Sequence, residues 1–187
     1  MSKTQQFLTL SLLLLISRFY DVYTTYLYIP DLKGETNILV RYFGAGWTAV
    51  ILVQTALVLL LIYALYHYLF RFKAVQPEQP GLSLKEYVSY LHFGNTHSFA
   101  RLFYALPTRR KVLLPALAYV ASGTLIVSGF IVGSSTSLLL CSELYRALYR
   151  MGIPYLLYGI IVSLAVYFST RFYRQLYAEH LCKRKEE

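Results

Sequence analysis

Charged residues are scarce in this chain. They make up 14% of its 187 residues, whereas soluble domains usually contain about 25%. Hydrophobic residues reach 57%, and this balance is typical of proteins that are embedded in a membrane. The composition therefore argues against an ordinary soluble domain, and the length is that of one transmembrane domain over residues 1–187.

Cysteine is also rare, and its positions restrict the chemistry. Cys141 and Cys182 fall on opposite sides of the membrane in the expected topology, so they do not form a disulfide. No cysteine or histidine spacing matches a metal site. Nucleophilic catalysis needs a base positioned beside a hydroxyl or thiol, and no such set stands out. We therefore expect no metal, no cofactor and no catalytic residue.

Long apolar runs, in contrast, are abundant. A membrane-spanning helix needs about 20 predominantly apolar residues. Four stretches meet this length, and the second and third exceed it, so their helices must tilt or extend into the headgroup layer. The four helices are expected at about 7–30, 42–70, 112–138 and 153–177. The sequence therefore predicts an all-α fold, an integral membrane four-helix bundle.

The basic residues are placed by topology. The net charge of +9 would suit nucleic acid, but the distribution of the charges argues against it. The loop after the second helix and the C-terminal tail contain Arg71, Lys73, Lys85, Arg101, Arg109, Arg110, Lys111, Arg171, Arg174, Lys183, Arg184 and Lys185, whereas the other side has Lys33, Arg41, Arg146 and Arg150. The positive-inside rule then predicts a multi-pass protein of the inner cell membrane with both termini cytoplasmic. Anionic lipids at the cytoplasmic face are the expected partners.

The cytoplasmic segment 74–111 has its own pattern. Ser83 and Glu86 fit a helix capping box. Two sets of apolar residues at helical spacing follow, namely Leu84, Tyr87, Val88 and Leu91, then Phe99, Leu102, Phe103 and Leu106. We expect two short amphipathic helices, a hairpin that lies on the membrane surface.

The first apolar run contains ionisable residues. Asp21, Thr24 and Thr25 share one helix face, and Arg18, three residues earlier, can reach Asp21. A charge in a membrane segment is costly and usually turns toward a partner or a cavity. We expect Asp21 to face the start of the second helix, near Gly44–Thr48.

A second polar cluster follows the first helix at its outer end. With it, the candidate ligand- or ion-binding site comprises Arg18, Asp21, Thr24, Thr25, Glu35, Asn37 and Arg41. Carboxylates and hydroxyls suit a cation or a proton relay, and a guanidinium suits an anionic headgroup. The alternative is structural: the charged pair neutralises itself and the threonines bond within or between helices.

Small residues predict where helices approach closely. Gly44 and Gly46 lie at the start of the second helix, and Gly129 and Gly133 form a G-x-x-x-G spacing in the third. Glycines of this kind let another backbone pack closely, either within the chain or in a homo-oligomer.

The first hairpin resembles an uncharacterised family of small bacterial membrane proteins. The matching residues are Asp21, Thr24, Thr25, Gly34, Glu35, Asn37, Gly44, Gly46 and Trp47, within residues 18–54. The family usually has proline where this chain has Ile38, and often lysine where it has Gln54. The resemblance implies a shared polar site and a bacterial inner membrane.

Three functions follow as hypotheses. The first is a non-catalytic subunit or accessory factor of a membrane complex, which fits the short loops and the packing glycines. The second is a small oligomeric transporter or ion-coupled carrier that uses the Asp21 cluster. The third is an intramembrane enzyme. Water reaching Asp21 would favour the second function over the first.

Overall fold

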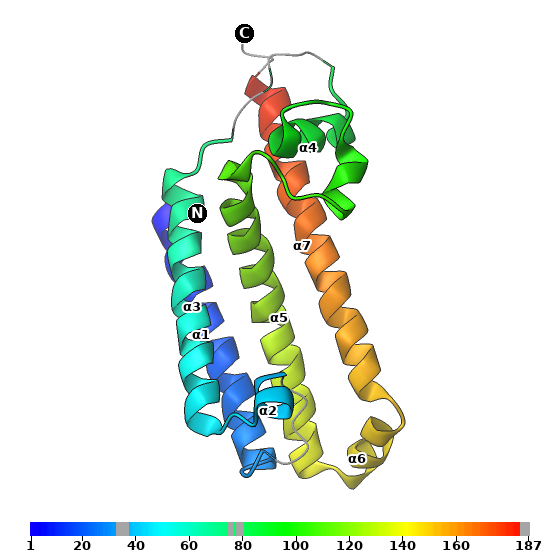
Figure 1. Cartoon of the computed structure of the whole chain (residues 1–187). Coiled ribbons are helices and arrows are strands. Elements are labelled where there is room, and N and C mark those ends of the chain that lie inside the picture. The colour runs from blue at the N-terminus through cyan, green and yellow to red at the C-terminus, as the bar shows by residue number, and fades with distance from the viewer. Residues whose placement is uncertain (33–37, 75–76, 78–80, 184–187) are drawn as a thin grey trace.

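Every secondary-structure element in the described part of the chain is a helix. The computed structural model describes residues 1–32, 38–74, 77 and 81–183. Four long helices run side by side along the molecule (Figure 1). They are α1 (Lys3–Tyr28), α3 (Trp47–Tyr66), α5 (Leu113–Cys141) and α7 (Ile153–Lys183), and each is long and apolar enough to cross a membrane. The all-helical prediction is confirmed.

Helix α5 occupies the centre of the arrangement. It packs against α1 and α3 on one side and against α7 on the other (Figure 1). Its buried positions include Ser122, Ser128, Gly129, Gly133 and Ser135. Small side chains at these positions let the neighbouring helices come close.

The G-x-x-x-G pair of α5 lies against α1. A Cβ atom at Gly129 would lie 3.0 Å from the backbone carbonyl oxygen of Ser17, and one at Gly133 would lie 2.5 Å from the Tyr20 ring. Larger residues would push the two helices apart. The close approach predicted at these glycines therefore occurs within the chain.

The predicted second helix, 42–70, is interrupted near its start. A short helix α2 (Ile38–Phe43) ends at Gly44, whose φ of +63° is left-handed, and α3 then begins at Trp47. Glycine adopts this conformation without the strain that a Cβ atom would cause. No described atom lies within 4 Å of a Cβ built on Gly44 or Gly46. Within the described chain they therefore make no close helix contact, and they lie at the break between α2 and α3; their packing against a second chain stays a prediction.

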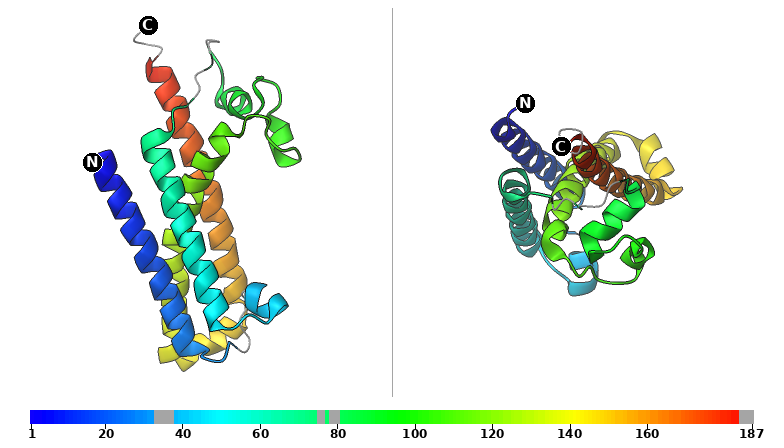
Figure 2. Two further views of the ribbon diagram at one scale, coloured as in Figure 1. Left: turned by 60° about the vertical axis from the view of Figure 1, so that its left-hand side comes forward. Right: turned by 90° about the horizontal axis from the view of Figure 1, so that it is seen from above.

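The two ends of the molecule differ in structure. Both termini lie at one end, which we call the terminal end, and α2 and α6 (Glu143–Arg150) lie at the other, the far end (Figures 1 and 2). Helix α6 connects α5 to α7. Its Arg146 donates hydrogen bonds to the carbonyl oxygens of Leu139 and Leu140, at 2.6 and 3.0 Å. Carbonyls at the end of a helix lack partners within it, so this arginine caps α5.

A hairpin projects beside the bundle at the terminal end (Figure 2). It follows η1 (His67–Arg71), a π-helical turn, and contains α4 (Leu84–Phe93) and the 3₁₀ turns η2 (Phe99–Phe103) and η3 (Arg110–Val112). The predicted capping box at Ser83 and Glu86 is present. The second predicted amphipathic helix is wrong, because η2 is a single 3₁₀ turn.

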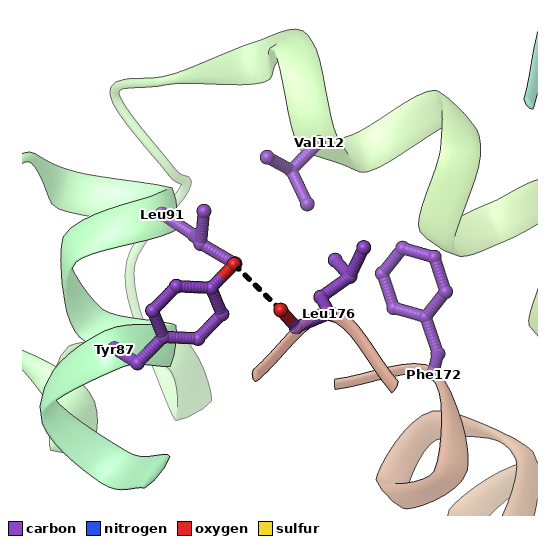
Figure 3. Close-up of a cluster of buried hydrophobic side chains, with 5 residues drawn as sticks. All are labelled: Tyr87, Leu91, Val112, Phe172 and Leu176. Carbon is purple, nitrogen blue, oxygen red and sulfur yellow. Dashed lines mark hydrogen bonds between the residues drawn. The ribbon is translucent and has the colours of Figure 1, made fainter. Parts of the chain in front are cut away.

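The apolar face of α4 is covered by α7. Tyr87 and Leu91 pack with Val112, Phe172 and Leu176 in one buried cluster (Figure 3). The Tyr87 hydroxyl donates to the carbonyl oxygen of Leu176 at 3.2 Å, as the dashed line in Figure 3 marks. This face of α4 was expected to contact the membrane surface, and helix packing buries it instead.

Candidate functional site

Arg18 and Asp21 form an ion pair on α1. The Nη2 atom of Arg18 donates to the Oδ2 atom of Asp21. The two side chains are largely buried, with 12% and 16% of their surfaces exposed. An isolated charge in a low-dielectric interior is costly. Because each side chain neutralises the other, both charged groups can be buried on the same helix.

The two threonines of the predicted site have different surroundings. Thr24 is buried, and its hydroxyl donates to the carbonyl oxygens of Tyr20 and Asp21 at 2.9 and 3.1 Å. The hydroxyl hydrogen of Thr24 is therefore engaged in hydrogen bonds within α1. Thr25 is half-buried and lines a cavity together with Asp21. Of the two hydroxyls, only that of Thr25 is placed to meet a ligand.

This cavity, which we call the polar pocket, lies where α1, α3 and α5 meet. It encloses about 140 Å³, and its lining includes Asp21, Thr25, Trp47, Gln54 and Val132. The Trp47 indole Nε1 donates to the carbonyl oxygen of Pro30 at 2.7 Å, which ties the start of α3 to the end of α1. Asp21 thus faces the first turns of α3, where the sequence places it.

A second cavity, which we call the lateral cleft, opens beside the first. It encloses about 210 Å³ between α1 and α3, and it is lined by Leu15, Arg18, Phe19, Val22, Ile51, Gln54, Thr55, Val58 and Leu59. The Nε atom of Arg18 is buried and has no hydrogen-bond partner among the residues that the structure describes. This donor is enclosed by the protein, although the Arg18 side chain also lines the cleft.

Gln54 separates the two cavities and contributes to both. Sequence reasoning did not include it, or Thr55, among the site residues. The signal was present, because a glutamine and a threonine side by side interrupt a run of aliphatic residues. Polar side chains inside a membrane helix tend to face other helices rather than lipid.

The remaining predicted site residues do not join this cluster in the described structure. Glu35 and Asn37 lie outside the described residues. Arg41 is exposed on α2, where its guanidinium lies 5.8 Å from the centre of the Tyr42 ring. It lines neither cavity. The described site is therefore the Arg18–Asp21 pair with Thr25, Gln54 and Trp47.

Metal binding finds no support in this region. Across the described residues, no group of three or more histidine, cysteine, aspartate or glutamate side chains could hold a metal ion. Cys141 and Cys182 are both free and exposed. The chemistry of the site is therefore that of an ion pair, an amide and a hydroxyl.

A second buried polar cluster fastens the hairpin to α7. His92 is 1% exposed, and its Nε2 atom lies 2.7 Å from the Tyr173 hydroxyl. The Tyr177 hydroxyl donates to the carbonyl oxygen of Leu82 at 2.6 Å. Burial lowers the pKa of His92, and burial aided by Glu179 raises the pKa of Tyr87 to about 12. His92 is therefore a buried residue that helps to hold the hairpin against α7.

Comparisons of this chain with protein-family models, with curated proteins and with solved structures gave no match. The resemblance of residues 18–54 to a family of bacterial membrane proteins therefore stays a prediction. The geometry of the two cavities and of the ion pair between them is therefore the basis for proposing a function.

Proposed function

We propose that this chain is a multi-pass inner-membrane protein that serves as a non-catalytic subunit or accessory factor of a larger membrane assembly. In this proposal the terminal end is cytoplasmic, because the positive-inside rule assigns the more basic side to the cytoplasm. The observation that carries the proposal is the lateral cleft, a mostly apolar recess between α1 and α3 that is also lined by Arg18, Gln54 and Thr55.

The outer surfaces of the long helices support a membrane location. Phe19, Leu52 and Val162 are 72%, 64% and 63% exposed, and many other large apolar side chains are similarly open. Soluble monomers rarely expose apolar patches of this extent. A bilayer would cover these faces without the cost of contact with water.

The lateral cleft supports an assembly role. Its walls are mostly aliphatic and aromatic, yet Arg18, Gln54 and Thr55 bring polar atoms to it. In a membrane, hydrogen bonds between helices help to hold them together. A partner helix that fills the cleft would bring its own polar side chains beside Gln54 and Thr55.

The exposed part of the hairpin fits the membrane surface. Tyr104 and Leu106 are 77% and 85% exposed, and Arg101 and Arg109 are exposed near them in sequence. Aromatic, aliphatic and basic side chains together are favoured at the boundary between lipid and water. We therefore place this edge of the hairpin, rather than the buried face of α4, on the cytoplasmic membrane surface.

Site-specific photo-crosslinking in native membranes tests the assembly role. A photoreactive amino acid at Thr55, inside the cleft, should yield one discrete protein adduct. At Leu57, which is exposed on another face of α3, the same group should yield lipid adducts only. Replacing Arg18 and Asp21 together by methionine and leucine should remove the Thr55 adduct. Equal adducts at both positions, or lipid alone at Thr55, would contradict the proposal.

A second candidate function, an ion-coupled carrier, is favoured by the polar pocket. Asp21 and Thr25 both line this cavity of about 140 Å³. Such a carrier would take up a proton or a small cation at Asp21. In proteoliposomes, Asp21→Asn should then abolish ion-driven uptake at a temperature where the variant is still folded. Wild-type protein that moves neither protons nor cations would exclude this function.

A further inference from the structure

The outer face of α7 has a shallow groove that is lined by α7 alone and that no other described helix covers. Phe172 and Leu176 turn toward α5 and the hairpin, whereas Leu156, Gly159 and Ser163 lie on the outer side. The groove is about 570 Å³ in volume at this level and is otherwise lined by apolar side chains and Tyr155 and Tyr167. No atom lies within 4 Å of a Cβ built on Gly159, so the floor of the groove is open.

The groove continues into a basic region toward the terminal end. There it measures about 430 Å³ and is lined by Tyr167, Thr170, Arg171, Arg174, Gln175 and Ala178. Tyr167 belongs to both parts, and its hydroxyl accepts a hydrogen bond from Nη1 of Arg171 at 3.2 Å. Both arginines are exposed, and neither forms an ion pair with a described carboxylate. Two positive charges therefore stand at one end of an apolar groove.

The depth of these arginines matches a lipid headgroup. From Ile153 to Arg171, α7 rises roughly 27 Å at 1.5 Å per residue, close to the thickness of about 30 Å of the hydrocarbon core. Val112, at the start of α5, packs against Phe172. The basic residues 109–111 therefore lie at the same level, as they would in a belt facing one leaflet.

We propose that the outer face of α7 binds one anionic phospholipid. Its phosphate lies between Arg171 and Arg174, and an acyl chain runs along the groove over Gly159 and Ser163. Charge complementarity selects an anionic headgroup, since arginine offers several N–H donors to phosphate oxygens. The missing side chain at Gly159 makes room for the chain. This site is separate from the lateral cleft; it rests on the membrane location in the proposed function but not on the assembly role.

Native mass spectrometry of the full chain, released from mixed phosphatidylglycerol and phosphatidylcholine micelles, tests the proposal. The wild type should retain one phosphatidylglycerol in preference to phosphatidylcholine. Arg171→Gln with Arg174→Gln should weaken this retention roughly 10- to 30-fold, whereas the lysine pair at the same positions should preserve most of it. Arg110→Gln with Lys111→Gln is the matched control, with equal charge loss at the same level, and should leave retention unchanged.

The acyl-chain part is tested by filling the groove. Gly159→Phe should reduce phosphatidylglycerol retention although both arginines remain, and soluble glycerol phosphate at millimolar concentration should not displace the lipid. Equal loss in the control pair would show a diffuse charge effect and overturn the site. Displacement by glycerol phosphate would show a simple anion site. A dimer that Gly159→Phe dissociates would show that a second copy of the chain occupies the face.

Discussion

The two buried polar clusters of this protein differ in charge and in the space around them. The Arg18–Asp21 pair is a salt bridge, and it lies between the polar pocket and the lateral cleft. The cluster of His92 and Tyr173 is neutral, and it lies in the buried contact between the hairpin and α7. The first cluster borders open space on two sides, so it is suited to binding. The second cluster is suited to a structural role, in which it stabilises the contact between the hairpin and α7.

The largest effect is expected from breaking the ion pair. Asp21→Asn leaves the buried Arg18 without its counter-ion, and loss of one partner of such a pair costs about 3–5 kcal/mol. We expect a large fall in the melting temperature in detergent. Replacing Arg18 and Asp21 together by methionine and leucine should restore most of the stability, because removal of both charges is often neutral. An unchanged melting temperature in Asp21→Asn would show that the pair contributes little.

A smaller effect is expected where α1 crosses α5. Gly129→Ala places a methyl group 3.0 Å from the Ser17 carbonyl oxygen, and overpacking of this kind costs about 1–3 kcal/mol. Gly159→Ala is the matched control, because its Cβ would meet no atom within 4 Å. Thermal unfolding of both variants should show destabilisation only at position 129. Equal melting temperatures would mean that the two helices can separate without cost.

The smallest effect is expected from acid at the hairpin. Burial lowers the pKa of His92 below its ordinary value of 6.5, so the undocked hairpin binds a proton more readily than the docked one. Docking should therefore be fully stable above about pH 6.5 and should weaken as the pH falls below it. Tyr87, with a pKa of about 12, stays neutral throughout.

Hydrogen exchange of α4 measures this directly. Protection of Leu84–Phe93 should fall between pH 7.5 and pH 5 after correction for the intrinsic exchange rate, and protection of α1 should not. In His92→Gln the difference between the two pH values should disappear. Protection that is equally pH-dependent in this variant would assign the effect to another group.

The sequence predicts the long helices well and their interruptions poorly. Hydropathy and length place all four, because backbone groups in an apolar segment must be satisfied within a helix. The break after α2 depends on the left-handed backbone at Gly44, which resembles an ordinary packing glycine in the sequence. The face of α4 has a similar ambiguity, because helical spacing of Tyr87 and Leu91 shows that a face is apolar but not what covers it.

The candidate site was only partly predictable for the same reason. The spacing of Arg18 and Asp21 on one helix is local, and so is the bond from Thr24 back to the backbone. Gln54 reaches the same place from a helix more than thirty positions later, and no local rule connects it to Asp21.

By itself the sequence determined the membrane character, the four helices and the ion pair. These follow from composition and from contacts between residues three or four positions apart on a helix. Only the tertiary structure decided that α5 is central, that α4 docks on α7, and that cavities flank the ion pair. Those features depend on which helix faces meet, which is set by packing between residues far apart in the chain.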